Sequence, residues 1–168
     1  MKRNAKQLAT GAVLAAVYVV LTHLQNMLLP GSANWAIQFR VSEALCIFAF
    51  FTPAAIPGLS LGCLLFNLTS GAALPLDFLV GTAATVGSAG CMWLLRKATV
   101  KGYPLPGFLM PAVWNALLVG WELTVYIGGG FLWNSCCVAI GEAAVLLILG
   151  SPLYFAIKKR GPDRLLGI

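Results

Sequence analysis

Five ionisable side chains lie inside or beside strongly apolar stretches of this chain: Arg40, Glu43, Asp77, Glu122 and Glu142. Charges are costly at membrane depth, so ionisable residues kept there usually mark a binding site or an ion path. Four carboxylates and one guanidinium suit a small, flat, polar ligand that offers hydrogen-bond donors, and they suit an anion poorly. A guanine-like edge fits, because its adjacent N–H and NH₂ groups donate to one carboxylate and its exocyclic oxygen accepts from arginine. A cationic substituent on such a ligand would need a second carboxylate.

The most polar of these stretches is the hexapeptide Gln38-Phe39-Arg40-Val41-Ser42-Glu43, which directly precedes the apolar run 44–51. Arg40 and Glu43 are three residues apart, the spacing of an ion pair at a helix start. Two interpretations are therefore open: a structural ion pair that holds the fold, or part of the wall of a binding pocket.

A second polar row follows the segment 105–127. Asn115, Glu122 and Tyr126 fall at spacings of seven and four, which places them on one helical face. Trp114 and Trp121 form another stripe, roughly 100° away, that could flank a planar ligand or face lipid. Lipid is the favoured environment for Trp114, and both remain open for Trp121.

Two further helical faces carry polar pairs: Ser60 with Asn67, and Ser135 with Glu142. Polar rows on successive helices that converge with Arg40 favour a pocket over scattered polarity in the core. The candidate substrate-binding residues are Gln38, Arg40, Glu43, Asn67, Asp77, Asn115, Trp121, Glu122, Tyr126 and Glu142.

The composition predicts where these residues lie. The chain has 168 residues, of which 60% are hydrophobic and 10% charged, and its mean hydropathy is +0.87. Such values are typical of a polytopic membrane protein, so we expect one membrane-embedded domain, 1–168, without a soluble domain. The net charge of +6 does not indicate nucleic acid, because the basic residues cluster at the ends of apolar segments. The single histidine and the scattered cysteines predict neither a metal site nor another cofactor.

The number of membrane crossings depends on the segment 38–66, which Pro53 and Pro57 interrupt. Read as one kinked span it gives five crossings, and read as two short spans it gives six. Six crossings put ten basic residues on one side, and the positive-inside rule then favours cytoplasmic termini. Those ten residues are Lys2, Arg3, Lys6, Arg96, Lys97, Lys101, Lys158, Lys159, Arg160 and Arg164.

The predicted fold is therefore an all-α integral membrane protein, a compact bundle of six transmembrane helices with both termini cytoplasmic. The second and third helices are short for a full crossing. Arg40 is then the one basic residue on the outer side, and the acidic residues gather in the outer half in a cavity open to the outside. The expected spans are about 7–29, 39–51, 55–70, 74–95, 105–127 and 131–157.

Small residues recur at four-residue spacing in the first span, including Ala9, Ala12 and Ala16, with Gly11 and Ala15 one step round the helix. Small residues at this spacing let another helix approach closely in lipid. A partner subunit and packing within the bundle are both compatible with the pattern.

Several motifs together resemble the QueT family, the substrate-binding (S) components of energy-coupling factor (ECF) transporters. They are Gln38-Phe39-Arg40-Val41-Ser42-Glu43-Ala44-Leu45, Ala55-Ile56-Pro57-Gly58-Leu59, Gly62-Cys63-Leu64, Asp77 in Pro75-Leu76-Asp77-Phe78, Trp114-Asn115, Gly120-Trp121-Glu122-Leu123 and Gly141-Glu142. The similarity covers nearly the whole chain. The family pattern is a compact six-helix bundle.

The resemblance implies uptake of a queuosine precursor, a deazaguanine such as a preQ-type base or queuine, into the cell across its membrane. It also implies that this subunit is not an enzyme and pairs with a transmembrane T component and two cytoplasmic ATPases. The alanines of the first helix, Ala12, Ala16 and their neighbours, would then contact the T component. Deazaguanines lack the N7 acceptor, so Arg40 would donate only to the ligand oxygen or would orient Glu43.

Other functions remain as alternatives. The chain could be an S component for another vitamin-like heterocycle, such as riboflavin or thiamin. It could also be a secondary carrier coupled to protons through Asp77, Glu122 and Glu142, but the inner half lacks ionisable relays for that mechanism. A membrane enzyme ranks third, because no nucleophile–base pair, HExxH motif or metal cluster is visible.

Overall fold

A computed structural model describes residues 2–30, 32, 39–71 and 73–162. Within these ranges the secondary structure is helical, and a single bridge between Val100 and Tyr103 closes a turn. In chain order the elements are α1 (Lys2–Leu28), η1 (Val41–Phe50), α2 (Ala55–Thr69), α3 (Asp77–Leu94), α4 (Leu105–Phe108), α5 (Met110–Tyr126), α6 (Phe131–Val145), η2 (Leu146–Gly150) and α7 (Ser151–Arg160).

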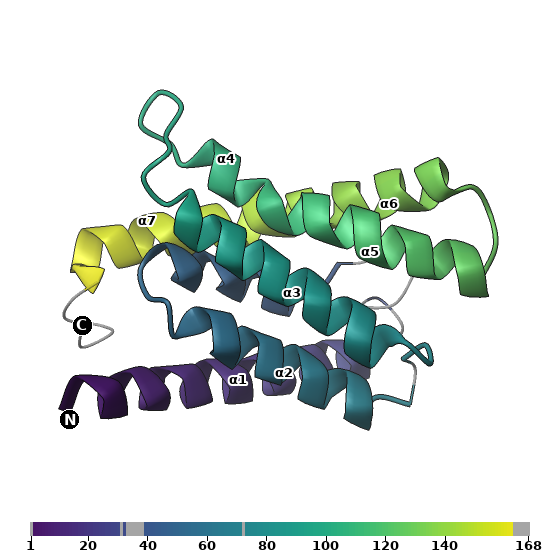
Figure 1. The fold of residues 1–168 in the computed structure, drawn as a ribbon, viewed down its shortest axis with the longest axis horizontal. Coiled ribbons are helices and arrows are strands. Elements are labelled where there is room, and N and C mark those ends of the chain that lie inside the picture. Colours follow the sequence, from purple (N-terminus) through teal and green to yellow (C-terminus); the bar gives the residue numbers. More distant parts are fainter. Residues whose placement is uncertain (1, 31, 33–38, 72, 163–168) are drawn as a thin grey trace.

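These elements form six successive helical passes, because α4 runs into α5 and α6 runs through η2 into α7. The start of α1 and the end of α7 lie at one end of the bundle, and the ends of α1, α2 and α5 lie at the other (Figure 1). The all-α prediction and the count of six are thus confirmed for the described residues.

Three of the six passes are long and apolar enough to cross a membrane: Asn4–Leu28, Leu105–Tyr126 and Phe131–Arg160. The elements η1 and α2 are shorter apolar helices. A π-helical turn, η2, carries the last pass past Pro152, which cannot donate a backbone hydrogen bond. The last pass is therefore continuous although it contains a proline.

The second pass, η1, is a ten-residue 3₁₀ helix. Runs longer than three or four residues are uncommon for this helix, whose rise of about 2.0 Å per residue makes η1 about 20 Å long. It packs against α1, α2, α3, α6, η2 and α7, and eight of its ten residues are buried. Side chains three residues apart eclipse one another in a 3₁₀ helix, so Glu43 and Cys46 are stacked on one edge.

Glycines let α1 and α2 approach closely. A Cβ atom on Gly58 of α2 would lie 2.5 Å from the carbonyl oxygen of Gly11 on α1. One turn further along α2, a Cβ atom on Gly62 would lie 2.8 Å from Cβ of Tyr18 and 3.0 Å from the carbonyl oxygen of Ala15. Such contacts leave no room for a methyl group, so these two glycines are required for the α1–α2 interface.

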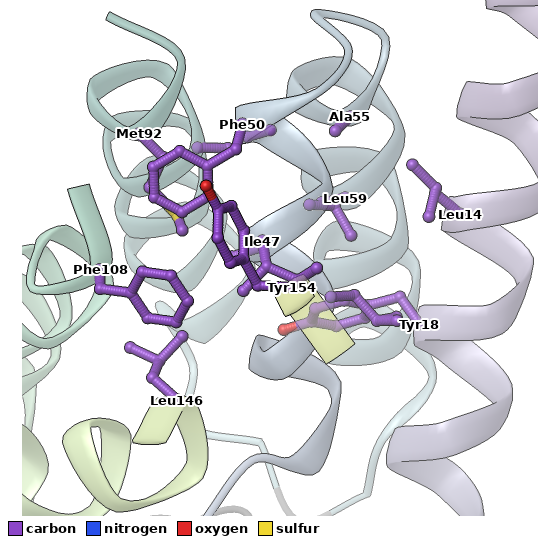
Figure 2. Close-up of a cluster of buried hydrophobic side chains, with 14 of the residues drawn as sticks. Leu14, Tyr18, Ile47, Phe50, Ala55, Leu59, Met92, Phe108, Leu146 and Tyr154 are labelled. Carbon is purple, nitrogen blue, oxygen red and sulfur yellow. The ribbon is translucent and has the colours of Figure 1, made fainter. Parts of the chain in front are cut away.

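A hydrophobic core joins η1 to the surrounding helices, and Figure 2 shows ten of its residues labelled. Phe50 stacks on Phe108 with ring centroids 5.3 Å apart, and both rings meet Tyr154 edge-on. These three residues come from the end of η1, from α4 and from α7. Their positions along the chain put them in the half of the bundle that holds the start of α1 and the end of α7 (Figure 1).

The same end of the bundle collects the basic residues, and we call it the basic end. Among the residues with described side chains, those at the basic end are Lys6, Arg96, Lys97, Lys101, Lys158, Lys159 and Arg160. The guanidinium of Arg96 lies 3.8 Å from the ring centroid of Trp93 and donates to the carbonyl oxygen of Trp93. The bundle is thus polarised, with cations at one end.

Candidate functional site

Five ionisable side chains form one buried cluster in the half of the bundle away from the basic end. Arg40, Glu43, Asp77, Glu122 and Glu142 are each no more than 2% exposed. They come from four helices, since Arg40 precedes η1, Glu43 lies in its first turn, Asp77 begins α3, and the last two lie on α5 and α6. We call these five residues the acid cluster.

Electrostatic contacts link every member of the acid cluster. Arg40 interacts with Asp77 and Glu43, Glu122 interacts with Asp77 and Arg40, and Glu142 interacts with Glu43 and Arg40. The five residues that the sequence singled out are therefore brought together by the fold. Four carboxylates around one guanidinium leave an excess of acidic groups, which favours a ligand rich in hydrogen-bond donors.

Arg40 forms an ion pair with Asp77, with 3.9 Å between Nη2 and Oδ1. The other Asp77 oxygen, Oδ2, accepts from the backbone N–H of Leu74 at 2.7 Å, which orients the carboxylate at the start of α3. A pair between Arg40 and Glu43 at three-residue spacing was one of the two sequence-based interpretations. Among the described residues, Arg40 forms its ion pair with Asp77 instead, which joins the residue before η1 to the start of α3.

The Glu43 carboxylate is held by two donors from the protein. Tyr18 of α1 donates its hydroxyl to Oε1 at 2.6 Å, and the Cys46 thiol approaches Oε2 at 3.2 Å. The Cys46 contact follows from the 3₁₀ geometry, which stacks residues three apart. Within the acid cluster, Glu43 is thus anchored by side chains of the protein itself.

Three polar residues of α1 bind the start of η1. Tyr18, Thr22 and Gln25 recur at spacings of four and three, which places them on one helical face. Thr22 donates to the Ser42 hydroxyl at 2.7 Å, and the side-chain oxygen of Gln25 accepts from the Val41 N–H at 2.8 Å. Sequence reasoning missed this row, although its spacing in an apolar helix was a signal that could have found it.

The carboxylates of Glu122 and Glu142 differ from that of Glu43. All four of their oxygens are buried, and no donor group of the described residues hydrogen-bonds to them; Glu122 lies beside the Asp77 carboxylate, which is itself an acceptor. Three more buried oxygens also lack a hydrogen-bond partner among the described residues: Ser88 Oγ, Ser135 Oγ and Asn67 Oδ1. A buried acceptor without a donor is costly, so these groups are suited to a ligand that supplies donors.

Asn67 and Asn115 are buried near α3 and α5. Asn67 donates from Nδ2 to the backbone carbonyl of Asp77 at 2.8 Å, while Asn115 donates to Pro111 of its own helix at 3.0 Å. A Cβ atom on Gly81 would lie 2.8 Å from Asn67 Nδ2 and 3.5 Å from Arg40 Nη1. Gly81 therefore lets Asn67 and Arg40 approach α3 together.

The two aromatic candidates on α5 are not brought to the acid cluster. Trp121 is 48% exposed and Tyr126 is 42% exposed, so their contact with a ligand stays a prediction. Trp114 does not face lipid as expected: a Cβ atom on Gly87 of α3 would lie 2.5 Å from its ring. Its indole N–H also donates to Cys91 Sγ at 3.4 Å. Gln38 lies outside the described residues.

The acid cluster is closed to solvent, whereas the sequence predicted a cavity open to the outside. Two surface grooves lie instead beside α1. One of about 350 Å³ runs between α1 and η1 and includes Ala9, and one of about 150 Å³ runs between α1 and α2 and includes Ala12. Among the described residues, no group of three or more His, Cys, Asp or Glu side chains is arranged so that it could hold a metal ion.

The small residues of α1 separate into two faces. Gly11 and Ala15 are buried against α2, whereas Ala9, Ala12 and Ala16 are exposed on the surface of α1. Packing within the bundle is thus confirmed for Gly11 and Ala15, and a partner contact at the exposed residues stays a prediction. The exposed set remains without a partner inside the described bundle.

Comparison with known proteins adds an independent observation. A family model described as the QueT transporter matches residues 8–159. The chain is also 35% identical over 155 residues to the queuosine precursor transporter QueT of Lactococcus lactis subsp. cremoris (strain MG1363), covering 88% of this chain and 89% of the relative. No solved structure matches the chain.

Proposed function

The chain belongs to the QueT transporter family, and from this we propose that it is the substrate-binding membrane subunit of an ECF-type importer. Its substrate is a queuosine precursor, a deazaguanine such as a preQ-type base or queuine, captured from outside the cell. The Lactococcus relative, a queuosine precursor transporter, supports this substrate class.

The observation that carries the proposal is the pair of unpartnered carboxylates in the acid cluster. Glu122 and Glu142 together place four buried acceptor oxygens on α5 and α6. A deazaguanine presents adjacent N–H and NH₂ donors that one carboxylate accepts in bidentate fashion. The second carboxylate accepts a donor or a cationic group on the opposite side of the ring.

The other members of the site have supporting positions. Arg40 donates to the exocyclic oxygen or steers the neighbouring acids, and Asp77 and Glu43 shape the cluster around it. Asn67 and Asn115 are buried on helices that line the cluster. We assign the half-exposed Trp121 and Tyr126 to the entry side of the pocket, and a substrate contact by Gln38 stays a prediction.

The orientation follows from the distribution of charge. With six crossings and the basic end in the cytoplasm, the positive-inside rule is satisfied and both termini are cytoplasmic. The acid cluster then lies in the outer half, and the aromatic core of Phe50, Phe108 and Tyr154 fills the inner half. A carrier with this packing needs a partner to release its substrate inward.

We assign that role to a T component with two cytoplasmic ATPases, which hydrolyse ATP while this subunit performs no catalysis. The exposed face of α1, with Ala9, Ala12 and Ala16, is the proposed contact with the T component. Small residues on a lipid-facing helix permit close packing of a second helix. Apolar grooves on both sides of α1 extend that surface.

Uptake of a labelled deazaguanine tests the proposal. Cells with this chain and the ECF module are expected to accumulate the label, and disabling the ATPases should abolish accumulation. Uptake driven by a pH gradient without the ATPases would instead support a proton-coupled carrier, against which the apolar inner core counts. Uptake of riboflavin or thiamin alone would keep the transporter class and exclude the queuosine precursor.

A further inference from the structure

The start of η1 holds an arginine and a glutamate at the spacing of an ion pair, yet Arg40 pairs with Asp77. The Nη2–Oδ1 distance to Asp77 is 3.9 Å, and the Glu43 carboxylate instead accepts the Tyr18 hydroxyl at 2.6 Å. Arg40 interacts electrostatically with Asp77 and also with Glu43. A specific restraint must therefore keep the two groups from forming the local pair.

We propose that Tyr18 is a positioning residue that turns Glu43 away from Arg40 and so keeps Arg40 paired with Asp77 in the substrate site. This inference rests on the proposed binding function of the acid cluster. It gives α1 a direct role in shaping the site, although α1 supplies none of the predicted substrate contacts.

The position of Tyr18 suits this role. Its side chain is fully buried and extends from α1 into the core, as Figure 2 shows. Gly62 of α2 lies directly against it, since a Cβ atom there would come within 2.8 Å of Tyr18 Cβ and 3.1 Å of Cγ. The ring is therefore fixed by packing, and its hydroxyl can hold Glu43 at one location.

Two neighbouring bonds fix the backbone that carries Glu43. Thr22 donates to Ser42 at 2.7 Å, and Gln25 accepts from the Val41 N–H at 2.8 Å. Cys46 approaches the other Glu43 oxygen at 3.2 Å. With both carboxylate oxygens of Glu43 engaged, Glu122 and Glu142 are the acids left for the ligand.

The same helix carries the proposed partner-facing residues on its opposite side. Tyr18 is buried, whereas Ala12 and Ala16 are exposed, roughly a third and a half of a turn round the helix from it. A displacement of α1 by the partner would strain the Tyr18–Glu43 bond and release Glu43 toward Arg40. This gives substrate release a physical route from the α1 surface to the acid cluster.

The test compares Tyr18→Phe, which keeps the ring and removes only the hydroxyl, with Tyr154→Phe as the matched control. Tyr154 is a buried tyrosine that packs against Phe50 and Phe108. Titration with a deazaguanine should show Kd raised about tenfold or more for Tyr18→Phe, because Glu43, without its hydrogen bond to Tyr18, can pair with Arg40 and draw it out of the site. Tyr154→Phe should leave Kd within about threefold, the scatter of substitutions away from a site.

A double-mutant cycle separates positioning from general structural damage. In a Glu43→Gln background the side chain that Tyr18 restrains carries no charge, so Tyr18→Phe should weaken binding no further. Equal losses in both backgrounds, or an unchanged Kd for Tyr18→Phe in the wild-type background, would overturn the proposal. If the wild-type protein binds no deazaguanine, the proposed function fails by itself.

A structure of the ligand-free Tyr18→Phe variant gives a second readout that needs no substrate. The proposal predicts that the Arg40 guanidinium moves within ion-pair distance of Glu43 and away from Asp77. A variant in which Arg40 stays on Asp77 and Glu43 keeps its position would refute it, whatever the binding data show.

Discussion

The Arg40 guanidinium lies 3.9 Å from the Asp77 carboxylate, and both side chains are almost fully buried. This contact joins the residue before η1 to the first residue of α3, two segments separated by the whole of α2. It is therefore a tertiary link through the centre of the acid cluster.

Replacing Asp77 by alanine should destabilise the bundle. The substitution removes the carboxylate that pairs with a buried guanidinium, a change that costs about 3–5 kcal/mol. Unfolding in detergent–SDS mixtures measures the loss. Leu79→Ala on the exposed face of α3 is the control, because Leu79 is 56% exposed and should change stability by only about 0.5 kcal/mol. Equal stability of the two variants would show that the Arg40–Asp77 ion pair does not stabilise the bundle.

Replacing Gly58 by alanine should separate α1 from α2. The added methyl group would meet the backbone of Gly11 at 2.5 Å, and overpacking of this kind costs about 1–3 kcal/mol. The melting temperature in detergent should fall accordingly. Gly90→Ala on α3 is the matched control, because a Cβ atom there has no neighbour within 4 Å. A melting temperature that falls as much for Gly90→Ala would contradict the α1–α2 assignment.

Neutralising either unpartnered carboxylate should weaken substrate binding. Glu122→Gln and Glu142→Gln each leave ligand donors poorly paired, at a cost of about 1–3 kcal/mol. That cost corresponds to a Kd raised about 5- to 150-fold. Trp133→Phe, at a residue 69% exposed on α6, serves as the control and should bind as the wild type does. An unchanged Kd for either glutamine variant would take that residue out of the site.

Larger side chains on the exposed face of α1 should block assembly with the T component but not substrate binding. Ala12→Leu with Ala16→Leu adds bulk where the T component is proposed to pack closely. Copurification of the T component and the ATPases with the tagged protein should be lost, while Kd for the substrate is retained. Ala83→Leu on an exposed face of α3 is the control for added bulk. Full assembly of the α1 variant would place the partner elsewhere.

Much of the architecture could be predicted because it depends on patterns along the chain. Prolines, apolar runs and the positions of Lys and Arg located six passes, and the observed helices begin and end within a few residues of the expected spans. The ionisable residues were identified as a cluster because membrane-embedded charges are rare.

The features that were predicted wrongly or missed depend on tertiary packing. The segment η1 is a 3₁₀ helix buried among six other elements, and its sequence pattern does not distinguish this geometry from an α-helix. Trp114 was expected in lipid because helical phase alone does not reveal Gly87 on the facing helix. Tyr18 was overlooked because its partner, Glu43, is 25 residues away in the sequence. The polar row that it forms with Thr22 and Gln25 was the only local signal.

Isothermal titration of the purified protein against a ligand panel measures directly which heterocycle the acid cluster binds. The panel contains deazaguanines, guanine, riboflavin and thiamin. The account predicts tight binding of a deazaguanine, weakened by Glu122→Gln and by Glu142→Gln, and no binding of riboflavin or thiamin. Binding of riboflavin alone, or deazaguanine binding that both glutamine variants retain in full, would contradict it.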